Sequence, residues 1–223
     1  MTMSEYRRPA IPVGIYRDEQ GIPIDYGNRW GGQSPPEDAY SRLTHLERFA
    51  PLHDVALALV EWLRSTFDVD VEKSLNAAAD LFLQPRDVVQ VVRIVPREHA
   101  AAPLTFVLSR FPGVFLHAGS LHDFHFPACG CDACDDNVTE LIDQLEWTVR
   151  TVVSGGYSES FAPVSGDWIA YRLDDLGGGM QAGRTSTQEL PNERVVAART
   201  AIPASGQWNS WPLRPQRDAN AVP

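Results

Sequence analysis

Two segments of this 223-residue chain repeat apolar residues at the spacing of an α-helix. Over 52–67, and again over 137–153, apolar side chains recur at three- and four-residue steps, which places them on one face of each helix. Pro51 suits the first position of the earlier helix. Asn137 followed by Glu140 has the spacing of a capping box at the start of the later one. We therefore predict two amphipathic helices, and each must pack its apolar face against another layer.

The segment between the two helices has the residue pattern of β-strands. Strands are predicted over 69–72, 87–95, 104–109 and 114–118, and Phe111-Pro112-Gly113 is typical of a tight turn between the last two. The part from residue 87 to residue 118 is expected to form a three-stranded antiparallel meander. The predicted fold class is therefore α+β, an antiparallel sheet with the two long helices packed on one of its faces.

The composition along the chain suggests three parts. Residues 1–36 are rich in proline and glycine and are expected to form an extended N-terminal arm. Residues 37–175 are expected to form the α+β core. Residues 176–223 are expected to be an irregular C-terminal extension, which Trp208 and Trp211 anchor to the core.

Several shorter features complete the structural prediction. We expect a short helix over 39–49 and a further strand over 168–173. Residues 194–200 look strand-like. Glu159 and the Asp174-Asp175 pair are interpreted as acids exposed to solvent.

Charge and hydropathy exclude some classes of partner. The chain has 29 acidic and 19 basic residues, a net charge of −10, and a negative surface repels phosphate backbones and anionic lipids. We therefore expect neither a nucleic acid nor a membrane as partner, and an unidentified ligand or protein instead. The longest apolar run, 55–60, is far shorter than a membrane span, and the first ten residues lack the apolar core of a signal peptide. A cytoplasmic location, where thiols stay reduced, is expected.

The strongest candidate for a functional site in this sequence is a run of three cysteine thiols within six residues. The cysteines of this C-x-C-x-x-C pattern are Cys129, Cys131 and Cys134. Three thiolates can fill three corners of a tetrahedral zinc site, so a fourth ligand is needed. We choose His125. If residues 121–126 are extended, His122 lies on the same face as Phe124 and Phe126 and points to the core, which leaves His125 on the other face. His122, His117 or a distant acid remain alternatives.

Other interpretations of the thiol run compete with zinc. The cysteines could pack as small apolar residues. They could form a redox site with Cys134 as nucleophile, because a position just before a helix start lowers a thiol pKa. The neighbouring acids Asp132, Asp135 and Asp136 oppose a thiolate and weaken that interpretation. An iron–sulfur cluster lacks its fourth cysteine.

The expected function follows from these alternatives. Three thiolates make a bound metal a weak Lewis acid, so a structural zinc site is favoured over a catalytic one. The chain contains no phosphate-binding, dinucleotide-binding or nucleophile-elbow motif. The leading hypothesis is a protein with a structural zinc site that acts by binding or regulation. The alternative is an enzyme, either a metal-assisted hydrolase or a thiol redox protein using Cys134.

Several segments of the chain also resemble a known family. They are 40–53, 102–106, 111–114, 126–135 and 206–214. Together they are similar to a family of proteins from high-GC Gram-positive bacteria that is classed as a domain of unknown function, over about residues 38–215. The run C-G-C-D-A-C-D is the most specific part of this resemblance. The resemblance implies a single intracellular bacterial domain that includes the tail with Trp208 and Trp211, and it implies no activity.

Overall fold

The protein is built from helices and two antiparallel β-sheets, as the computed structural model shows for residues 5–12, 14–162 and 166–215. The strands of the larger sheet are β1 (Val69–Glu72), β2 (Val88–Pro96), β3 (Leu104–Ser109), β4 (Val114–Ala118) and β5 (His122–Phe126). They lie in the order β1-β2-β3-β4-β5, and each neighbouring pair is antiparallel. The predicted α+β class with an antiparallel sheet is therefore confirmed.

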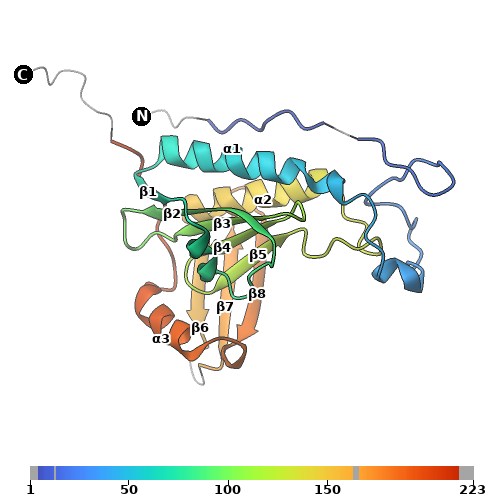
Figure 1. Cartoon of the computed structure of the whole chain (residues 1–223). Helices are drawn as coiled ribbons and strands as arrows, with labels where there is room; N and C mark the ends of the chain where they lie inside the picture. Colours follow the sequence, from blue (N-terminus) through green and yellow to red (C-terminus); the bar gives the residue numbers. More distant parts are fainter. Residues whose placement is uncertain (1–4, 13, 163–165, 216–223) are drawn as a thin grey trace, which may run out of the picture.

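Two helices lie on one face of this sheet (Figure 1). They are α1 (Pro51–Thr66) and α2 (Val138–Val153). Their buried side chains join alternate residues of the strands, such as Phe106 and Leu116, in the main hydrophobic core. Pro51 opens α1, and the Asn137 side chain accepts hydrogen bonds from two backbone N–H groups in the first turn of α2. None of the described helices combines the length and apolarity needed to cross a bilayer.

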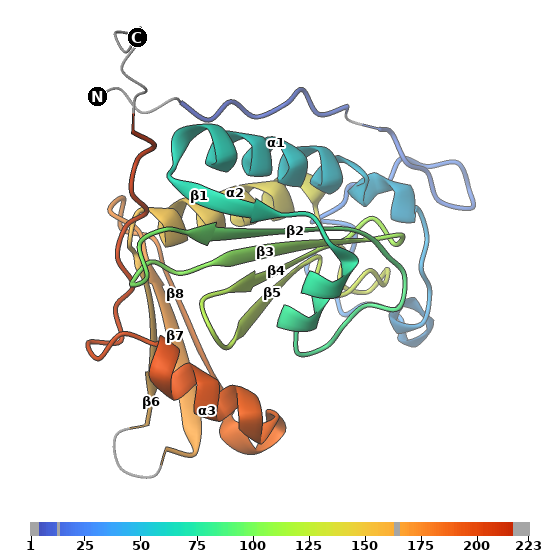
Figure 2. The same ribbon diagram turned by 60° about the vertical axis from the view of Figure 1, so that its left-hand side comes forward.

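The opposite face of the five-stranded sheet contacts a short 3-10 helix. This helix is η3 (Leu75–Asp80), which precedes β2 (Figure 2). Its Ala77 and Ala78 pack against Val91 of β2 and Val107 of β3. Because η3 is short, it covers only part of this face with apolar contacts, and polar residues occupy neighbouring positions on the same strands.

A second sheet follows α2 in the chain. It consists of β6 (Tyr157–Phe161), β7 (Trp168–Asp174) and β8 (Met180–Ser186), all antiparallel. In Figures 1 and 2 its strands run across the direction of the first sheet's strands. The predicted strand over 168–173 corresponds to β7. We did not predict β8, because its sequence has no alternation of apolar and polar residues and it is held by its pairing with β7.

The C-terminal segment also contains a helix where we expected irregular or extended chain. Helix α3 (Asn192–Ala201) includes the whole of 194–200, so the strand-like interpretation of those residues was wrong. Adjacent valines at 195 and 196 suggested a strand, but the alanines that follow them favour a helix. Buried Val195 and Ala198 are three residues apart, which puts both on one face of the helix.

The predicted helix over 39–49 is replaced by two separate turns. They are the 3-10 helices η1 (Glu37–Tyr40) and η2 (Leu46–Phe49). His45, between them, has a φ of +52°. This left-handed backbone conformation cannot continue a right-handed helix, so the segment changes direction before α1.

The N-terminal arm lies over the two long helices as an irregular segment (Figure 1). Tyr6 packs on Trp62 of α1 with ring centroids 5.6 Å apart, and its hydroxyl donates to Glu146 of α2 at 2.8 Å. Arg8 donates to the same carboxylate. The three-part division of the chain stays a prediction. The described residues do not include 1–4 and 13 of the predicted arm or 216–223 of the predicted C-terminal extension.

Glu159 is buried, and this corrects our interpretation of it as a solvent-exposed acid. Its side chain accepts hydrogen bonds from the backbone N–H groups of Ser120 and Leu121, both at 2.9 Å, and from Nε1 of Trp208 at 3.0 Å. Trp211 is also buried and donates to a backbone carbonyl at 2.9 Å. The two tryptophans therefore anchor the C-terminal tail to the core, and Glu159 accepts the hydrogen bond that holds Trp208.

Candidate metal centre

The three thiols converge at one place on the surface. The sulfur atoms of Cys129, Cys131 and Cys134 all lie within 4.8 Å of one another. Sγ of Cys131 lies 3.5 Å from Sγ of Cys134. Cys131 is buried, whereas Cys129 and Cys134 are exposed. The arrangement offers three sulfur ligands to one ion and leaves one side of the cluster accessible.

The thiol loop, defined here as residues 129–135, connects β5 to α2. The backbone N–H of Cys131 donates to Sγ of Cys129 at 3.4 Å, which folds the first three residues tightly. Gly130 packs closely on Phe111, because a Cβ atom there would lie 2.6 Å from the phenylalanine ring. The φ of Gly130 is not in the left-handed region, so close packing explains the glycine.

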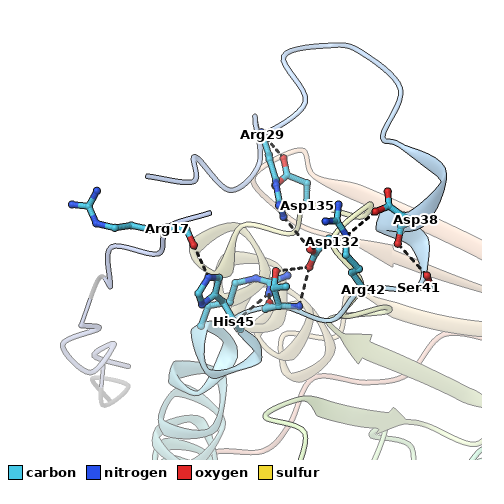
Figure 3. A network of polar contacts seen from close by, with 10 residues as sticks. Arg17, Arg29, Asp38, Ser41, Arg42, His45, Asp132 and Asp135 are labelled. Carbon is cyan, nitrogen blue, oxygen red and sulfur yellow. Dashed lines mark hydrogen bonds and ion pairs between the residues drawn. The ribbon is translucent and has the colours of Figure 1, made fainter. Parts of the chain in front are cut away.

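The two acids of the thiol loop, Asp132 and Asp135, contact residues that are distant in the chain (Figure 3). Asp132 is fully buried and accepts hydrogen bonds from the backbone N–H and the hydroxyl of Thr44, at 2.9 and 2.7 Å. Its other oxygen lies 3.3 Å from Nη1 of Arg29. Asp135 accepts the backbone N–H of Arg29 at 2.7 Å. We expected these acids to oppose a thiolate, but they instead tie the N-terminal arm to the loop.

The residues around Asp132 also determine the charge of its carboxyl group. Burial alone would raise the pKa of this carboxyl, but the hydrogen bonds from Thr44 and the charge of Arg29 lower it below its ordinary value. Asp132 is therefore ionised at neutral pH and pairs with a cation of the arm. Arg42 lies further away, 4.0 Å from the same carboxylate.

The thiols differ from one another in their acidity. Burial raises the pKa of Cys131, but hydrogen bonds from Cys129 and from backbone N–H groups outweigh burial and lower it. Burial and hydrogen bonds to the other two thiols raise the pKa of Cys134 to about 12. We expected the helix start to lower the pKa of Cys134. However, α2 begins at Val138, and its free N–H groups are already capped by Asn137.

The structure does not place His125 in the group of three sulfurs. It lines the same small cavity as Cys134, of about 280 Å³, and its ring packs on Phe115 with centroids 4.9 Å apart. Its Nε2 atom is buried and has no hydrogen-bond partner within the described residues. Burial lowers the pKa of His125, so its ring is neutral at pH 7, as metal ligation requires.

The other histidines considered as ligands have different surroundings. His122 is buried against Phe124 and Tyr171. Nδ1 of His117 lies 2.7 Å from Asp123. Neither belongs to the cysteine group. The expected alternation along β5 is present, with His122 and Phe124 buried and His125 half-buried.

Sequence reasoning found the thiols but not the residues that support them. The contact between Asp132 and Thr44 joins positions 88 residues apart, and the contact between Asp135 and Arg29 joins positions 106 apart. A single sequence contains no signal for such pairs. The only usable hint was the presence of acids inside the thiol run, which we interpreted through charge repulsion alone.

Comparison with known proteins now identifies the family. A family model described as a family of unknown function, DUF6226, matches residues 12–215. The chain belongs to this family. No curated protein and no solved structure matches the chain. The match extends the expected resemblance at its N-terminal end, from about residue 38 to residue 12, and it assigns no activity.

Proposed function

We propose that the thiol loop binds one zinc ion, or a similar soft metal, as a structural site. The observation that supports this most directly is the convergence of three sulfur atoms within 4.8 Å of one another. Thiolates are the ligands that zinc and other soft metals prefer. The hydrogen bonds that lower the pKa of Cys131 favour the deprotonated form in which a thiol binds a metal.

We propose His125 as the fourth ligand. Its neutral ring lines the cavity next to Cys134, and its Nε2 atom lacks a hydrogen-bond partner among the described residues. Because a buried polar atom without a partner is unfavourable, a bond from Nε2 to the metal would remove that cost. His125 lies outside the sulfur group, so ligation requires a local movement of the loop or of the imidazole. The alternative is a site with three sulfurs and an exchangeable water.

We propose that the metal serves binding rather than chemistry. A metal at the thiols would stiffen the loop whose acids hold the N-terminal arm. Residues of the arm, among them Arg29 and Trp30, line an open cavity of about 580 Å³ together with Asp132 of the loop. A ligand or protein bound there would depend on the order of the loop. This role suits a reducing compartment such as the cytoplasm of a high-GC Gram-positive bacterium, where thiols stay available for metal.

Elemental analysis of the full-length protein, purified without added metal, tests the proposal. The expected result is one zinc per chain, with thiols that react slowly with a disulfide reagent until a chelator is added. Cys131→Ser should remove the metal. His125→Ala should release it at lower chelator concentration, whereas the matched variant His99→Ala, which removes an exposed histidine, should not.

A second candidate function, thiol redox chemistry, has one observation in its favour. The sulfur atoms of Cys131 and Cys134 are 3.5 Å apart, close enough to form a disulfide after a small movement. The raised pKa of Cys134 argues against that residue as the attacking thiolate. Protein without metal, with three rapidly reacting thiols and a 131–134 disulfide on mild oxidation, would favour this candidate and contradict the zinc site.

A further inference from the structure

A continuous row of polar residues crosses all five strands of the larger sheet. The residues directly opposite one another in register are Glu72, Arg93, Thr105, His117 and Asp123, one from each strand. Residues paired in this way share a face of the sheet. Their neighbours along the strands, such as Ile94 and Leu116, belong to the core under α1 and α2. The polar row therefore faces away from the two long helices.

The row contains an oriented histidine. Nδ1 of His117 lies 2.7 Å from Oδ1 of Asp123, and both side chains are more than nine-tenths buried. The other oxygen of Asp123 accepts the backbone N–H of Phe82 at 2.7 Å, which fixes the carboxylate. Because the carboxylate is an acceptor, the proton of a neutral His117 lies on Nδ1. Its Nε2 atom is then a hydrogen-bond acceptor, and no partner for it is found among the described residues.

A cavity of about 410 Å³ lies beside this row. His117, Arg93 and Ser120 line it from the sheet and its turns, and Trp208 contributes an apolar wall. Helix α3 provides the opposite wall through Arg194 and three alanines, at positions 197, 198 and 201. Figures 1 and 2 show α3 on the side of the sheet away from α1 and α2. The volume lies at the lower end of the roughly 300–1,000 Å³ that is typical of small-molecule sites.

The charges around the cavity leave one cation without an acidic partner. Asp80 is bound by Arg93, at 3.2 Å, and by the hydroxyl of Thr105, at 2.6 Å. Glu98 is exposed and accepts a backbone N–H of its own loop at 3.2 Å. Arg194 donates to the backbone carbonyl of Asp80 at 2.5 Å and forms no ion pair with an acid within the described part of the chain.

The Arg194 side chain is also held in place. Its guanidinium carbon lies 4.8 Å from the centre of the Phe82 ring. A guanidinium fixed by stacking and by one hydrogen bond keeps further N–H groups for an anion, and a planar carboxylate matches their geometry. The cavity thus combines a fixed cation, a free acceptor on His117 and an apolar wall.

We infer that this cavity binds a small organic carboxylate. Arg194 would hold the carboxylate, and the alanines of α3 and Trp208 would contact the apolar part. Nε2 of His117 would accept a hydrogen bond from a hydroxyl group in ligands that carry one, which benzoate does not. None of the residues that line this cavity belongs to the thiol loop. The inference therefore stands independently of the zinc site.

Binding of benzoate to the full-length protein, compared with its uncharged counterpart benzamide, tests this inference. The backbone amide signals of Gly119 and Ser120, which line the cavity, can be followed by two-dimensional NMR during each titration. We expect saturable shifts with benzoate. Benzamide should bind at least about tenfold more weakly, because it is neutral and offers arginine one carbonyl oxygen in place of a carboxylate pair.

Two substitutions and a matched control make the test specific. Arg194→Gln should weaken benzoate binding by about tenfold or more and weaken benzamide binding much less. Arg184→Gln is the control, since Arg184 stacks on Trp168 of the second sheet in the same way but lies outside the cavity. Ala197→Leu fills the cavity without removing a polar contact and should abolish binding of both probes.

Three results would overturn the inference. They are the absence of saturable shifts with benzoate, equal affinities for benzoate and benzamide, and equal effects of the two arginine substitutions. If Arg194→Gln does not fold, the Ala197→Leu variant decides, because undiminished benzoate binding by that protein would place the probe elsewhere.

Discussion

Replacing Gly119 by alanine tests the packing between the β4–β5 turn and Glu159. Gly119 has a φ of +66°, in the left-handed region. A Cβ atom built on it would lie 2.8 Å from the ring of Tyr157 and 3.0 Å from the carboxyl carbon of Glu159, with a carboxylate oxygen closer still. Both neighbours are fully buried and hydrogen-bonded, so neither can move away without losing contacts.

The expected loss of stability has two parts. An alanine in the left-handed conformation costs about 1–2 kcal/mol. Forcing a methyl group into a packed core typically adds a further 1–3 kcal/mol or so. Gly178→Ala separates the two parts, because Gly178 has a φ of +94° and nothing within 4 Å of an added Cβ atom. Gly119→Ala should therefore lower the free energy of unfolding by about 1–3 kcal/mol more than Gly178→Ala does.

Urea unfolding followed by circular dichroism measures both variants, with unchanged m-values as the check that the same transition is compared. A double-mutant cycle with Glu159→Ala adds a second test. Removing the carboxylate makes room for the methyl group, so the combined loss should be smaller than the sum of the single losses. Equal losses at Gly119 and Gly178, or strict additivity in the cycle, would refute the packing argument.

Two further predictions concern pH and the N-terminal arm. Burial lowers the pKa of His122 to about 3, from the ordinary value of 6.5. Its contribution to stability is thus present above pH 6.5 and is lost as the pH falls towards 3, and between pH 7 and 5 the loss is about 2 kcal/mol. Between pH 7 and 5, the free energy of unfolding of His122→Leu, measured by urea titration, should fall by about 2 kcal/mol less than that of the wild type. Equal decreases in the two proteins would show that His122 does not control this pH dependence. Asp132→Asn removes the buried charge that pairs with Arg29, so trypsin should cleave the arm about tenfold faster. Asp38→Asn, at an exposed ion pair with Arg42, is the control, and equal cleavage rates in the two variants would contradict the role of Asp132.

Local sequence patterns predicted the elements whose stability is mostly local. The helices over 52–67 and 137–153 correspond closely to α1 and α2, because an amphipathic stripe and a capping residue are visible within one segment. Four of the five strands of the larger sheet were predicted, over 69–72, 87–95, 104–109 and 114–118, because their apolar runs and turn residues are visible within one segment. Strands β6 and β8 and helix α3 were missed, because pairing with β7 and packing against the sheet decide their conformation.

The same distinction applies to the sites. The thiol cluster could be predicted, because its three ligands lie within six residues and any compact loop brings them together. The polar row could not, because Arg93, Thr105, His117 and Asp123 meet only through strand register. The sequence by itself therefore determined the two helices and the grouping of the cysteines. Only the tertiary structure decided that Asp132 holds the arm, that Glu159 is buried and that a cavity opens beside His117, since each depends on contacts between residues distant in the chain.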